Sequence, residues 1–536
     1  MNGHRFALLA DLHLSDLSMT SAHCALQWAV ELVNRERPDF LAVAGDVTTY
    51  GTGRSAALFL EELRKVEVPV FFTPGNAELR SPEGMELLAE LCAQERRVAV
   101  TGDLLAIFPD TSTGRLPEDE RKWLERCVAD HPEAQRCIVV THFPLNRLEE
   151  ESRKWLREWM ERQSVELLAA GHTHVNEVRR DNGWTEVITR GLDPDKAIGD
   201  LPGINFLTSV EKGMWMEEFR PWQFAVELLP ADLPVDASPV GWSIHGCPIE
   251  AAEETLASGL SCLELRPRDL EFSRQGLAEG LGRLRDRSPI FLSYHLSNLT
   301  WNSERGVIDG EAELRAHLER ALEAGVDSVT MHVPRVAASL MEGEGGATTL
   351  YEEFAELYAR VFEAPVRAGV RLSIENLHNG PGTPVDDPEL KFATTIDEYL
   401  RWIDALEKRM PQGRIGAHLD VGHARNNGGP LDNMQPLGDW YARLGRRITG
   451  YHIHQVGAHP ETGKLANHLE IGSLFGRRIS YAGFLHAWSR KQIARAPLFV
   501  EVRAEEARRS TAERLRKLFE RAGEIRESAE LPDRTG

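Results

Sequence analysis

Five short groups of polar residues in the first half of the chain carry side chains of the kinds that bind divalent metal ions. Each group directly follows an apolar run, where a strand would break into a loop. The seven Asp, Asn and His residues in these groups can hold two ions about 3.5–4 Å apart, with one carboxylate bridging them. Such a pair binds phosphate oxygens and lowers the pKa of a bridging water, which then acts as a nucleophile. The groups are Asp11-Leu-His13, Gly45-Asp46, Gly75-Asn76-Ala77-Glu78, Thr141-His142 and Gly171-His172-Thr173-His174.

This ordered pattern resembles that of the calcineurin-like metallophosphoesterase family, in which D-x-H, GD, GN-H-[DE], H and GHxH follow one another. The resemblance covers residues 5 to about 228. It implies a phosphatase or phosphodiesterase that uses two divalent ions (Mn, Fe, Zn or Co), with Asp46, Asn76 and His142 as catalytic residues. One ion would be held by Asp11, His13, Asp46 and His174, and the other by Asp46, Asn76, His142 and His172, so that Asp46 bridges the two.

One position departs from the family pattern. Ala77 stands where the family usually has a histidine that is thought to assist the leaving group. Because loss of a general acid costs about 10²–10⁴-fold in rate, we expect a preference for substrates with good leaving groups. The acid could also come from Glu78 or from the substrate. A metal-binding domain without catalysis stays an alternative.

Acidic residues and histidines also end apolar runs in the second half of the chain. Ionisable groups in such places are costly unless they are paired or bound to metal. The carboxyl ends of strands are where TIM barrels keep their chemistry. We therefore expect a second metal site, formed by Tyr294-His295, Met331-His332, Ile374-Glu375-Asn376, Leu419-Asp420-Val-Gly-His423, Tyr451-His452-Ile-His454 and Val500-Glu501.

This second pattern resembles the xylose-isomerase-like superfamily, which contains sugar isomerases, epimerases and endonuclease IV. The resemblance implies one to three divalent ions (Zn, Mn or Co) and makes Glu375 and Glu501 the catalytic carboxylates. The metal-binding quartet of the epimerases corresponds to Glu375, Asp420, His452 and Glu501. The extra ligands of the endonuclease IV cluster correspond to His295, His332, His423 and His468. Ala466 replaces an aspartate of that cluster, so a third ion would be weakly held, or held with His454 or water. The alternative for these histidines is a barrel mouth lined by substrate-binding side chains.

Four further residues are candidates for contact with substrate. His454 shares the inward strand face with His452, because side chains two apart point the same way, and the choice of ligand between them is open. His245 ends the first run of the second half, and Glu264 and Arg266 end the second run. An ordinary polar rim is the alternative for these three positions.

The elements that would position these residues follow from the apolar runs. In the first half, runs such as 6–10, 40–44 and 165–170 alternate with amphipathic stretches such as 22–36 and 55–65, which predicts alternating strands and helices. We expect a four-layer α/β/β/α domain over residues 1–229 and a proline-rich linker at 230–239. Eight runs then predict a (β/α)8 TIM barrel over residues 240–536. The runs are 240–247, 261–266, 290–295, 328–332, 370–375, 415–419, 448–454 and 497–502.

Composition narrows the class of partner. At 536 residues the chain needs at least two cores. The formal net charge of −21 would repel a polyphosphate, so the charge disfavours binding of nucleic acid. Six scattered cysteines without a CxxC pair predict buried thiols rather than a disulfide framework. With no secretory signal and no apolar run of about 18 residues, we expect a cytoplasmic protein and no membrane contact. A homo-oligomer is left open.

Together these patterns favour a bifunctional metalloenzyme, in which a phosphoesterase is joined to a sugar isomerase or epimerase-like barrel. The substrate of the barrel would be a small sugar or polyol phosphate. Two alternatives remain. One is a nucleic-acid repair nuclease with a barrel like that of endonuclease IV, and the other is a non-catalytic, metal-dependent sensor of phosphate or sugar.

Overall fold

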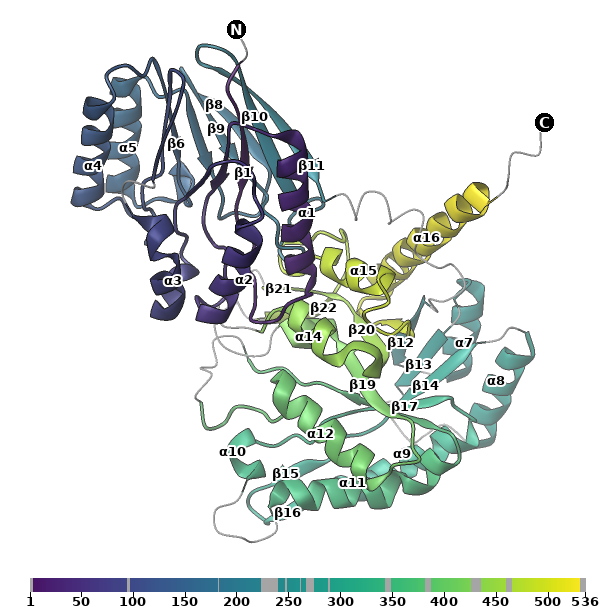
Figure 1. Ribbon diagram of the computed structural model, residues 1–536. Helices are drawn as coiled ribbons and strands as arrows, with labels where there is room; N and C mark the ends of the chain where they lie inside the picture. Colours follow the sequence, from purple (N-terminus) through teal and green to yellow (C-terminus); the bar gives the residue numbers. More distant parts are fainter. Residues whose placement is uncertain are drawn as a thin grey trace, which may run out of the picture. The chain divides into compact units, whose positions relative to one another are not determined.

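The structure is a computed structural model (Figure 1) that describes residues 3–93, 97–181, 183–222, 240–245, 248–260, 262–266, 274–287, 290–342, 349–380, 387–425, 435–458 and 465–530. The chain divides into two compact units. Met1–Glu227 and Ser473–His486 form the first unit, and Leu228–Gly472 and Ala487–Gly536 form the second. The predicted linker at residues 230–239 lies outside the described residues.

The first unit contains two sheets. A five-stranded sheet has the order β11-β10-β1-β2-β3, in which β1 pairs parallel with β2 and antiparallel with β10. Its strands are β1 (Arg5–Leu9), β2 (Phe40–Val43), β3 (Val70–Phe72), β10 (Gly203–Glu211) and β11 (Met214–Pro221). A six-stranded sheet has the order β4-β5-β6-β7-β9-β8. Its strands are β4 (Val98–Thr101), β5 (Leu104–Ile107), β6 (Arg136–Val140), β7 (Leu167–Ala170), β8 (Glu177–Asp181) and β9 (Trp184–Ile188).

Helices cover the outer faces of both sheets, which gives the predicted α/β/β/α layers. Successive residues of a strand face opposite sides, so Ala7 and Leu9 pack towards the helices while Phe6 and Leu8 pack towards the second sheet. A third cluster joins the six-stranded sheet to α4 and α5, which lie side by side in Figure 1. The helices are α1 (Ser21–Glu36), α2 (Gly53–Leu63), α3 (Pro82–Cys92), α4 (Glu118–Asp130) and α5 (Glu150–Gln163).

The first unit also includes a segment from late in the sequence, Ser473–His486. The backbone N–H of Gly199 donates to the carbonyl of Phe475 at 2.9 Å. The hydroxyl of Ser21 donates to the carbonyl of Gly483 at 3.1 Å. The compact first unit is therefore not made of residues 1–227 alone.

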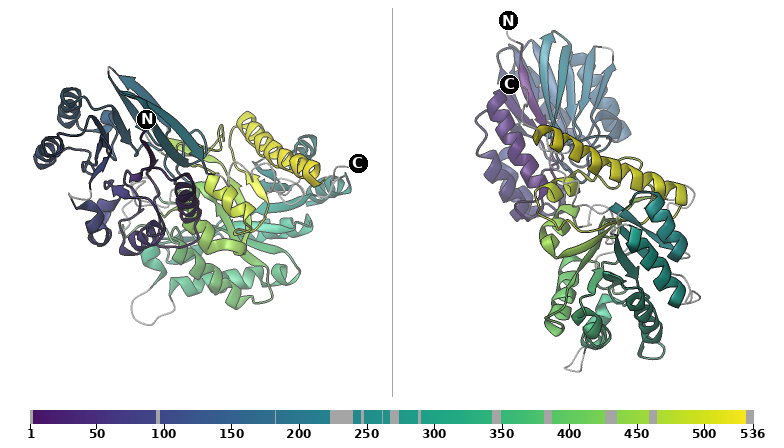
Figure 2. Two further views of the ribbon diagram at one scale, coloured as in Figure 1. Left: turned by 45° about the horizontal axis from the view of Figure 1, so that its top comes forward. Right: turned by 90° about the vertical axis from the view of Figure 1, so that its right-hand side faces the viewer.

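The second unit is a closed barrel of eight parallel strands, as the eight apolar runs predict. Figure 2 shows its helices outside the strands in two further views. The strands, in barrel order, are β12 (Val240–His245), β13 (Cys262–Arg266), β14 (Phe291–His295), β17 (Ser328–His332), β18 (Arg371–Glu375), β19 (Ile415–Asp420), β20 (Ile448–Ile453) and β23 (Leu498–Val500). The main helices are α7 (Pro248–Ala257), α8 (Arg274–Arg287), α9 (Glu311–Glu323), α11 (Leu350–Arg367), α12 (Ile396–Arg409), α14 (Leu437–Leu444) and α16 (Glu505–Glu530). Helix α15 (Ala482–Ser489) begins in the late segment of the first unit and ends in the second unit.

The loops at the carboxyl ends of the barrel strands contain short hairpins and helical turns. Two hairpins are formed by β15 (Thr300–Asn302) with β16 (Val307–Asp309), and by β21 (Gln455–Ala458) with β22 (Leu465–Leu469). Two helical turns are α10 (Ala338–Met341) and α13 (Val421–Arg425).

Strand register brings the polar strand ends together. His332 pairs with Glu375 across β17 and β18, and Asp420 pairs with His452 across β19 and β20. Because these residues end or nearly end their strands, their side chains converge at one mouth of the barrel.

The described residues also bear on two expectations from composition. In this part of the chain no helix has both the length and the apolarity that a membrane crossing requires. The cysteines found there, Cys24, Cys92, Cys127, Cys137 and Cys262, are free thiols. Cys247 lies outside the described residues.

Candidate metal centres

In the first unit, the structure brings the seven predicted ligands together in two adjoining groups. Asp11, His13 and His174 offer ligand atoms that all lie within 4.8 Å of one another, and so do Asp46, His142 and His172. One oxygen of Asp46 lies 3.6 Å from Nε2 of His13, and the other lies 3.4 Å from Nε2 of His142. Asp46 therefore faces both groups, as a bridging carboxylate would.

Asn76 completes the second group. Its Oδ1 lies 3.2 Å from Nε2 of His142 and 3.1 Å from Nδ1 of His172. Nδ1 of His142 lies 2.8 Å from the carbonyl of Ala44, to which it can only donate. Nε2 of His142 therefore presents a lone pair towards the oxygen of Asn76, an arrangement that a cation between them would stabilise.

Backbone geometry at these loops is strained in a way that is typical of functional sites. Left-handed φ angles are uncommon for residues other than glycine and cluster at such sites. Here they occur at Asp11, His13, Asp46, His172 and His174. Gly75 packs against the bridging residue, since a Cβ there would lie 2.3 Å from Oδ1 of Asp46.

The donor set of the first unit fits divalent ions. Oδ1 of Asp11 and both ring nitrogens of His13 are buried and make no hydrogen bond with any described residue. Burial raises the pKa of Asp11 and Asp46, and the neighbouring carboxylates of Asp46 and Asp193 raise that of Asp11 further. Burial lowers the pKa of His142 to about 4, so this histidine is neutral and ready to act as a ligand near neutral pH.

The two residues after Asn76 have structural roles. The backbone N–H of Ala77 donates to Oδ1 of Asp46 at 2.7 Å. The buried carboxylate of Glu78 accepts from the N–H groups of Asp46 and Gly75, each at 2.8 Å, and from the N–H of Thr48 at 3.1 Å. Glu78 thus ties three loop segments together, and its oxygens are directed at backbone donors rather than at a leaving group.

In the second unit, two groups of candidate ligands share one carboxylate. Glu375, Asp420, His452 and Glu501 form one group, and His295, His332 and Glu375 form the other, again with all ligand atoms of a group within 4.8 Å. Oε2 of Glu375 lies 2.9 Å from Nε2 of His295, whereas Oε1 lies 3.1 Å from Nδ1 of His452. The two oxygens of Glu375 therefore face different groups.

The atoms of the first group point at one another without donors between them. Nδ1 of His452 lies 3.0 Å from Oε2 of Glu501. These two atoms and Oε1 of Glu375 are buried and make no hydrogen bond with the described residues. Burial alone would lower the pKa of His452, but the surrounding carboxylates of Glu375, Glu264 and Glu501 raise it well above its ordinary value. Such an excess of buried negative charge is suited to a cation.

Three further histidines surround these groups. His423 lies with Nδ1 3.4 Å from Oε1 of Glu375, and His468 lies with Nδ1 3.4 Å from Oε1 of Glu501. Neither His423 nor His468 belongs to a group of three converging ligand atoms among the described residues, and a further such group in the second unit is formed by Glu264, His418 and His452. His454 is buried with Nε2 3.1 Å from Oδ1 of Asp420, so it lies behind that carboxylate.

The other three residues predicted to contact substrate differ in where they lie relative to the cavity of the second unit. Glu264 is fully buried and 2.7 Å from Nε2 of His452, so it lies beneath the histidine rather than at the cavity surface. Arg266 lines the cavity and pairs with Oε1 of Glu501 at 2.7 Å. His245 ends β12, but its side chain lies outside the described part of the structure.

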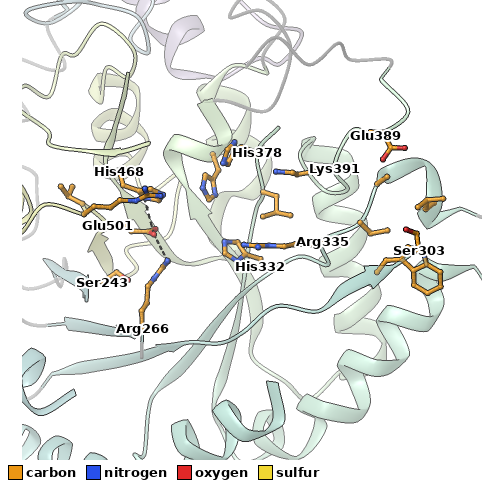
Figure 3. Close-up of a pocket in the computed structure, with 18 of the residues that line it drawn as sticks. Ser243, Arg266, Ser303, His332, Arg335, His378, Glu389, Lys391, His468 and Glu501 are labelled. Atoms are coloured by element: carbon orange, nitrogen blue, oxygen red, sulfur yellow. Dashed lines mark ion pairs between the residues drawn. The ribbon is translucent and has the colours of Figure 1, made fainter. Parts of the chain in front are cut away.

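A cavity of about 1130 Å³ opens beside the second unit's ligands (Figure 3). His332, His423, His468 and Glu501 line it, and this volume suits a small organic substrate. Sequence reasoning missed several of its lining residues, among them Trp301, Arg335, His378 and Lys391. His378 follows Glu375 by three residues and could have been found as a strand-end histidine. Arg335 and Lys391 lie on loops and Trp301 on the hairpin strand β15, and none of these three belongs to a motif.

Each half of the chain matches a known protein family, and the two families are those that the sequence patterns resemble. Residues 252–529 match the family described as the xylose isomerase-like TIM barrel. Residues 4–176 match the family described as calcineurin-like phosphoesterase.

Two curated relatives match the first half. A protein of Arcobacter nitrofigilis named "Probable glycerophosphodiester phosphodiesterase GpdQ" is 26% identical over 173 residues, which are 28% of this chain and 63% of that protein. A "Transmembrane protein with metallophosphoesterase domain" of Danio rerio is 28% identical over 198 residues, which are 33% of this chain and 42% of that protein. The chain therefore spans less than two thirds of the length of either relative.

Solved structures resemble each half separately. A xylose isomerase domain protein from Planctomyces limnophilus is 14% identical and covers 54% of this chain and 99% of its own, with a TM-score of 0.39. A dimetal phosphatase from Danio rerio is 13% identical and covers 42% of this chain and 100% of its own, with a TM-score of 0.33.

Proposed function

Because the chain belongs to the xylose isomerase-like TIM barrel family through residues 252–529 and carries a calcineurin-like phosphoesterase domain in residues 4–176, we propose that it is a bifunctional enzyme with two separate metal centres. The first centre hydrolyses a phosphate monoester or diester. The second acts on a small sugar or polyol phosphate in the barrel cavity.

The position of Asp46 between two ligand groups carries the proposal for the first centre. Two divalent ions held there would supply Lewis acidity and a water of lowered pKa. The chain's own part is to hold the ligands in place: Ala44 orients the ring of His142, and Ala77 and Glu78 fix the loop of Asp46. The name of the Arcobacter nitrofigilis relative favours a phosphodiester as the substrate.

The barrel has two candidate reactions. Glu375 faces two ligand groups, and a pair of ions bridged by one carboxylate can bind both the attacking and the leaving oxygen of an ester, which favours hydrolysis. Glu375 and Glu501 also flank His452 at 3.1 and 3.0 Å. Two carboxylates around a single ion favour isomerisation or epimerisation instead, with one carboxylate moving a proton.

A turnover screen with full-length protein tests both assignments. Bis(p-nitrophenyl) phosphate and p-nitrophenyl phosphate would be offered with Mn, Fe, Zn or Co, and a panel of sugar phosphates would be followed for both isomerised and hydrolysed products. Asp46→Ala should remove nitrophenol release and spare the barrel reaction, whereas Glu375→Ala should do the reverse. Metal binding without turnover of any substrate would favour a sensor, and cleavage of an oligonucleotide by the wild type but not by Glu375→Ala would favour the nuclease.

A further inference from the structure

Two loops at the mouth of the barrel are joined through their backbones. The N–H of Phe392 donates to the carbonyl of Val336 at 2.9 Å, and the N–H of Ala338 donates to the carbonyl of Leu390 at 2.7 Å. The first loop follows β17 and the second follows β18, so both loops begin at strands that end in candidate ligands. Arg335 and Lys391 lie on these joined segments.

The backbone of each of these two residues is fixed independently. The N–H of Arg335 donates to the carbonyl of Leu299 at 3.1 Å, and the carbonyl of Arg335 accepts from the N–H of Trp301 at 3.3 Å. The N–H of Lys391 donates at 2.8 Å to Oδ1 of Asn379, a buried side chain. The two side chains are therefore presented from anchored positions.

Both side chains face the cavity beside the metal ligands. Figure 3 shows the guanidinium of Arg335 directed towards His332 and the ammonium of Lys391 directed towards His378. The ring of His378 packs against that of His423, with centroids 4.7 Å apart. The two cations thus lie at the edge of the candidate metal centre, within the same cavity.

In the described part of the chain, no ion pair joins Arg335 or Lys391 to a carboxylate. Arg266, at the Glu501 side of the cavity, differs because it is paired with that residue at 2.7 Å. Partial burial lowers the pKa of Lys391, and the positive charge of Arg335 lowers it further. Glu389 is the other acidic residue among those that line the cavity, and no ion pair connects it to either cation in the described structure. Two like charges that face one cavity, with no carboxylate partner among the described residues, are stabilised when an anion binds between them.

We propose that Arg335 and Lys391 form an anion subsite that binds the phosphate group of the barrel's substrate, with the reacting end of that substrate at Glu375 and Glu501. Guanidinium and ammonium groups together are the usual partners of a phosphate ester. Val336 and Leu340, which follow Arg335 in sequence, and Trp301, whose N–H donates to the carbonyl of Arg335, line the cavity and supply apolar surface for the carbon skeleton. This inference rests on the proposed function, since it assigns the phosphorylated end of the proposed substrate class.

Calorimetric titration of the full-length, metal-loaded protein with methylphosphonate tests the subsite. This probe mimics a phosphate monoester but cannot be hydrolysed. The double variant Arg335→Gln with Lys391→Gln should lose one class of binding sites, with affinity reduced about ten- to hundredfold for the loss of two charge-assisted hydrogen bonds. Phosphonate bound at the metal centres should be the same in wild type and variant. Lys408→Gln, which removes an exposed cation elsewhere on the barrel, should match the wild type.

Two outcomes would overturn the subsite. One is an identical isotherm for wild type and double variant, and the other is acetate binding as tightly as methylphosphonate with the same dependence on the two cations. Arg335→Lys with Lys391→Arg keeps both charges and should bind within about threefold of the wild type, which separates charge recognition from misfolding. The proposed function fails separately: absence of metal from the barrel would overturn it, while a phosphonate site that depends on the two cations would still stand.

Discussion

His452 donates from Nε2 to the buried carboxylate of Glu264 at 2.7 Å and turns its Nδ1 towards Glu375 and Glu501. Glu264 also accepts from the hydroxyl of Ser243 at 2.8 Å. A carboxylate behind a histidine fixes both the ring orientation and the tautomer, and it makes the other ring nitrogen a better metal ligand. We infer that Glu264 is a positioning residue of the second centre, a role different from the substrate contact or polar rim considered from the sequence.

Glu264→Gln should weaken metal binding in the barrel about 10–100-fold, because the amide keeps the size of the side chain but loses the charge that supports His452. Competition with a chromogenic chelator on full-length protein measures the change. Glu363→Gln, which breaks an exposed ion pair on α11, should leave the affinity as it is. An unchanged affinity in Glu264→Gln would mean that His452 needs no orienting carboxylate.

Asp46→Ala should release both ions of the first unit and abolish phosphate ester hydrolysis, since each of its oxygens faces a different ligand group. The ions of the barrel should remain. Elemental analysis of full-length protein gives the count directly, and Glu375→Ala supplies the reciprocal control. Loss of barrel metal in Asp46→Ala would show that the two centres are not independent.

Much of the fold can be predicted from the sequence because it depends on local patterns of apolar and polar residues. Buried parallel strands are short aliphatic runs, and the eight runs of the second half each coincide, within a few residues, with a strand of the closed barrel. Strand ends such as Ile374-Glu375 and Val500-Glu501 mark where an apolar run becomes ionisable. Those residues meet in the structure because parallel strands end at one mouth of a barrel.

Contacts between distant segments could not be predicted from the sequence in the same way. Arg335 and Lys391 belong to different loops that are brought together by hydrogen bonds between the loops. The segment Ser473–His486 joins the first unit through contacts such as that of Ser21 with Gly483, and nothing in its composition indicates that. Glu264 and Arg266 share a strand face in the sequence, but only the packing opposite them shows that one lies beneath His452 and the other lines the cavity.

The alanine at position 77 should make hydrolysis in the first unit depend steeply on the leaving group. Glu78 is engaged with backbone donors of Asp46, Gly75 and Thr48, so it does not replace the missing acid. Esters of nitrophenol should be cleaved at least about 10²-fold faster than alkyl esters, which is the low end of a general acid's contribution. The measurement is kcat/KM across a series of esters whose alcohols differ in pKa. A flat series would indicate that an acid reaches the leaving group from another residue or from the substrate.

The barrel should hold two ions on either side of Glu375. Its Oε2 lies 2.9 Å from His295 and 3.4 Å from His332, and its Oε1 lies 3.1 Å from His452, so each oxygen belongs to a different ligand group. Anomalous scattering from crystals of the metal-loaded protein should give one peak beside His295 and His332 and a second beside Asp420, His452 and Glu501. His295→Ala should lose the first peak and keep the second, and Glu375→Ala should lose both. If the His295 variant also loses hydrolysis of a sugar phosphate, the two metal ions together catalyse ester cleavage. A single peak beside Glu501 in the wild type would discard the paired centre and leave isomerisation as the reaction of the barrel.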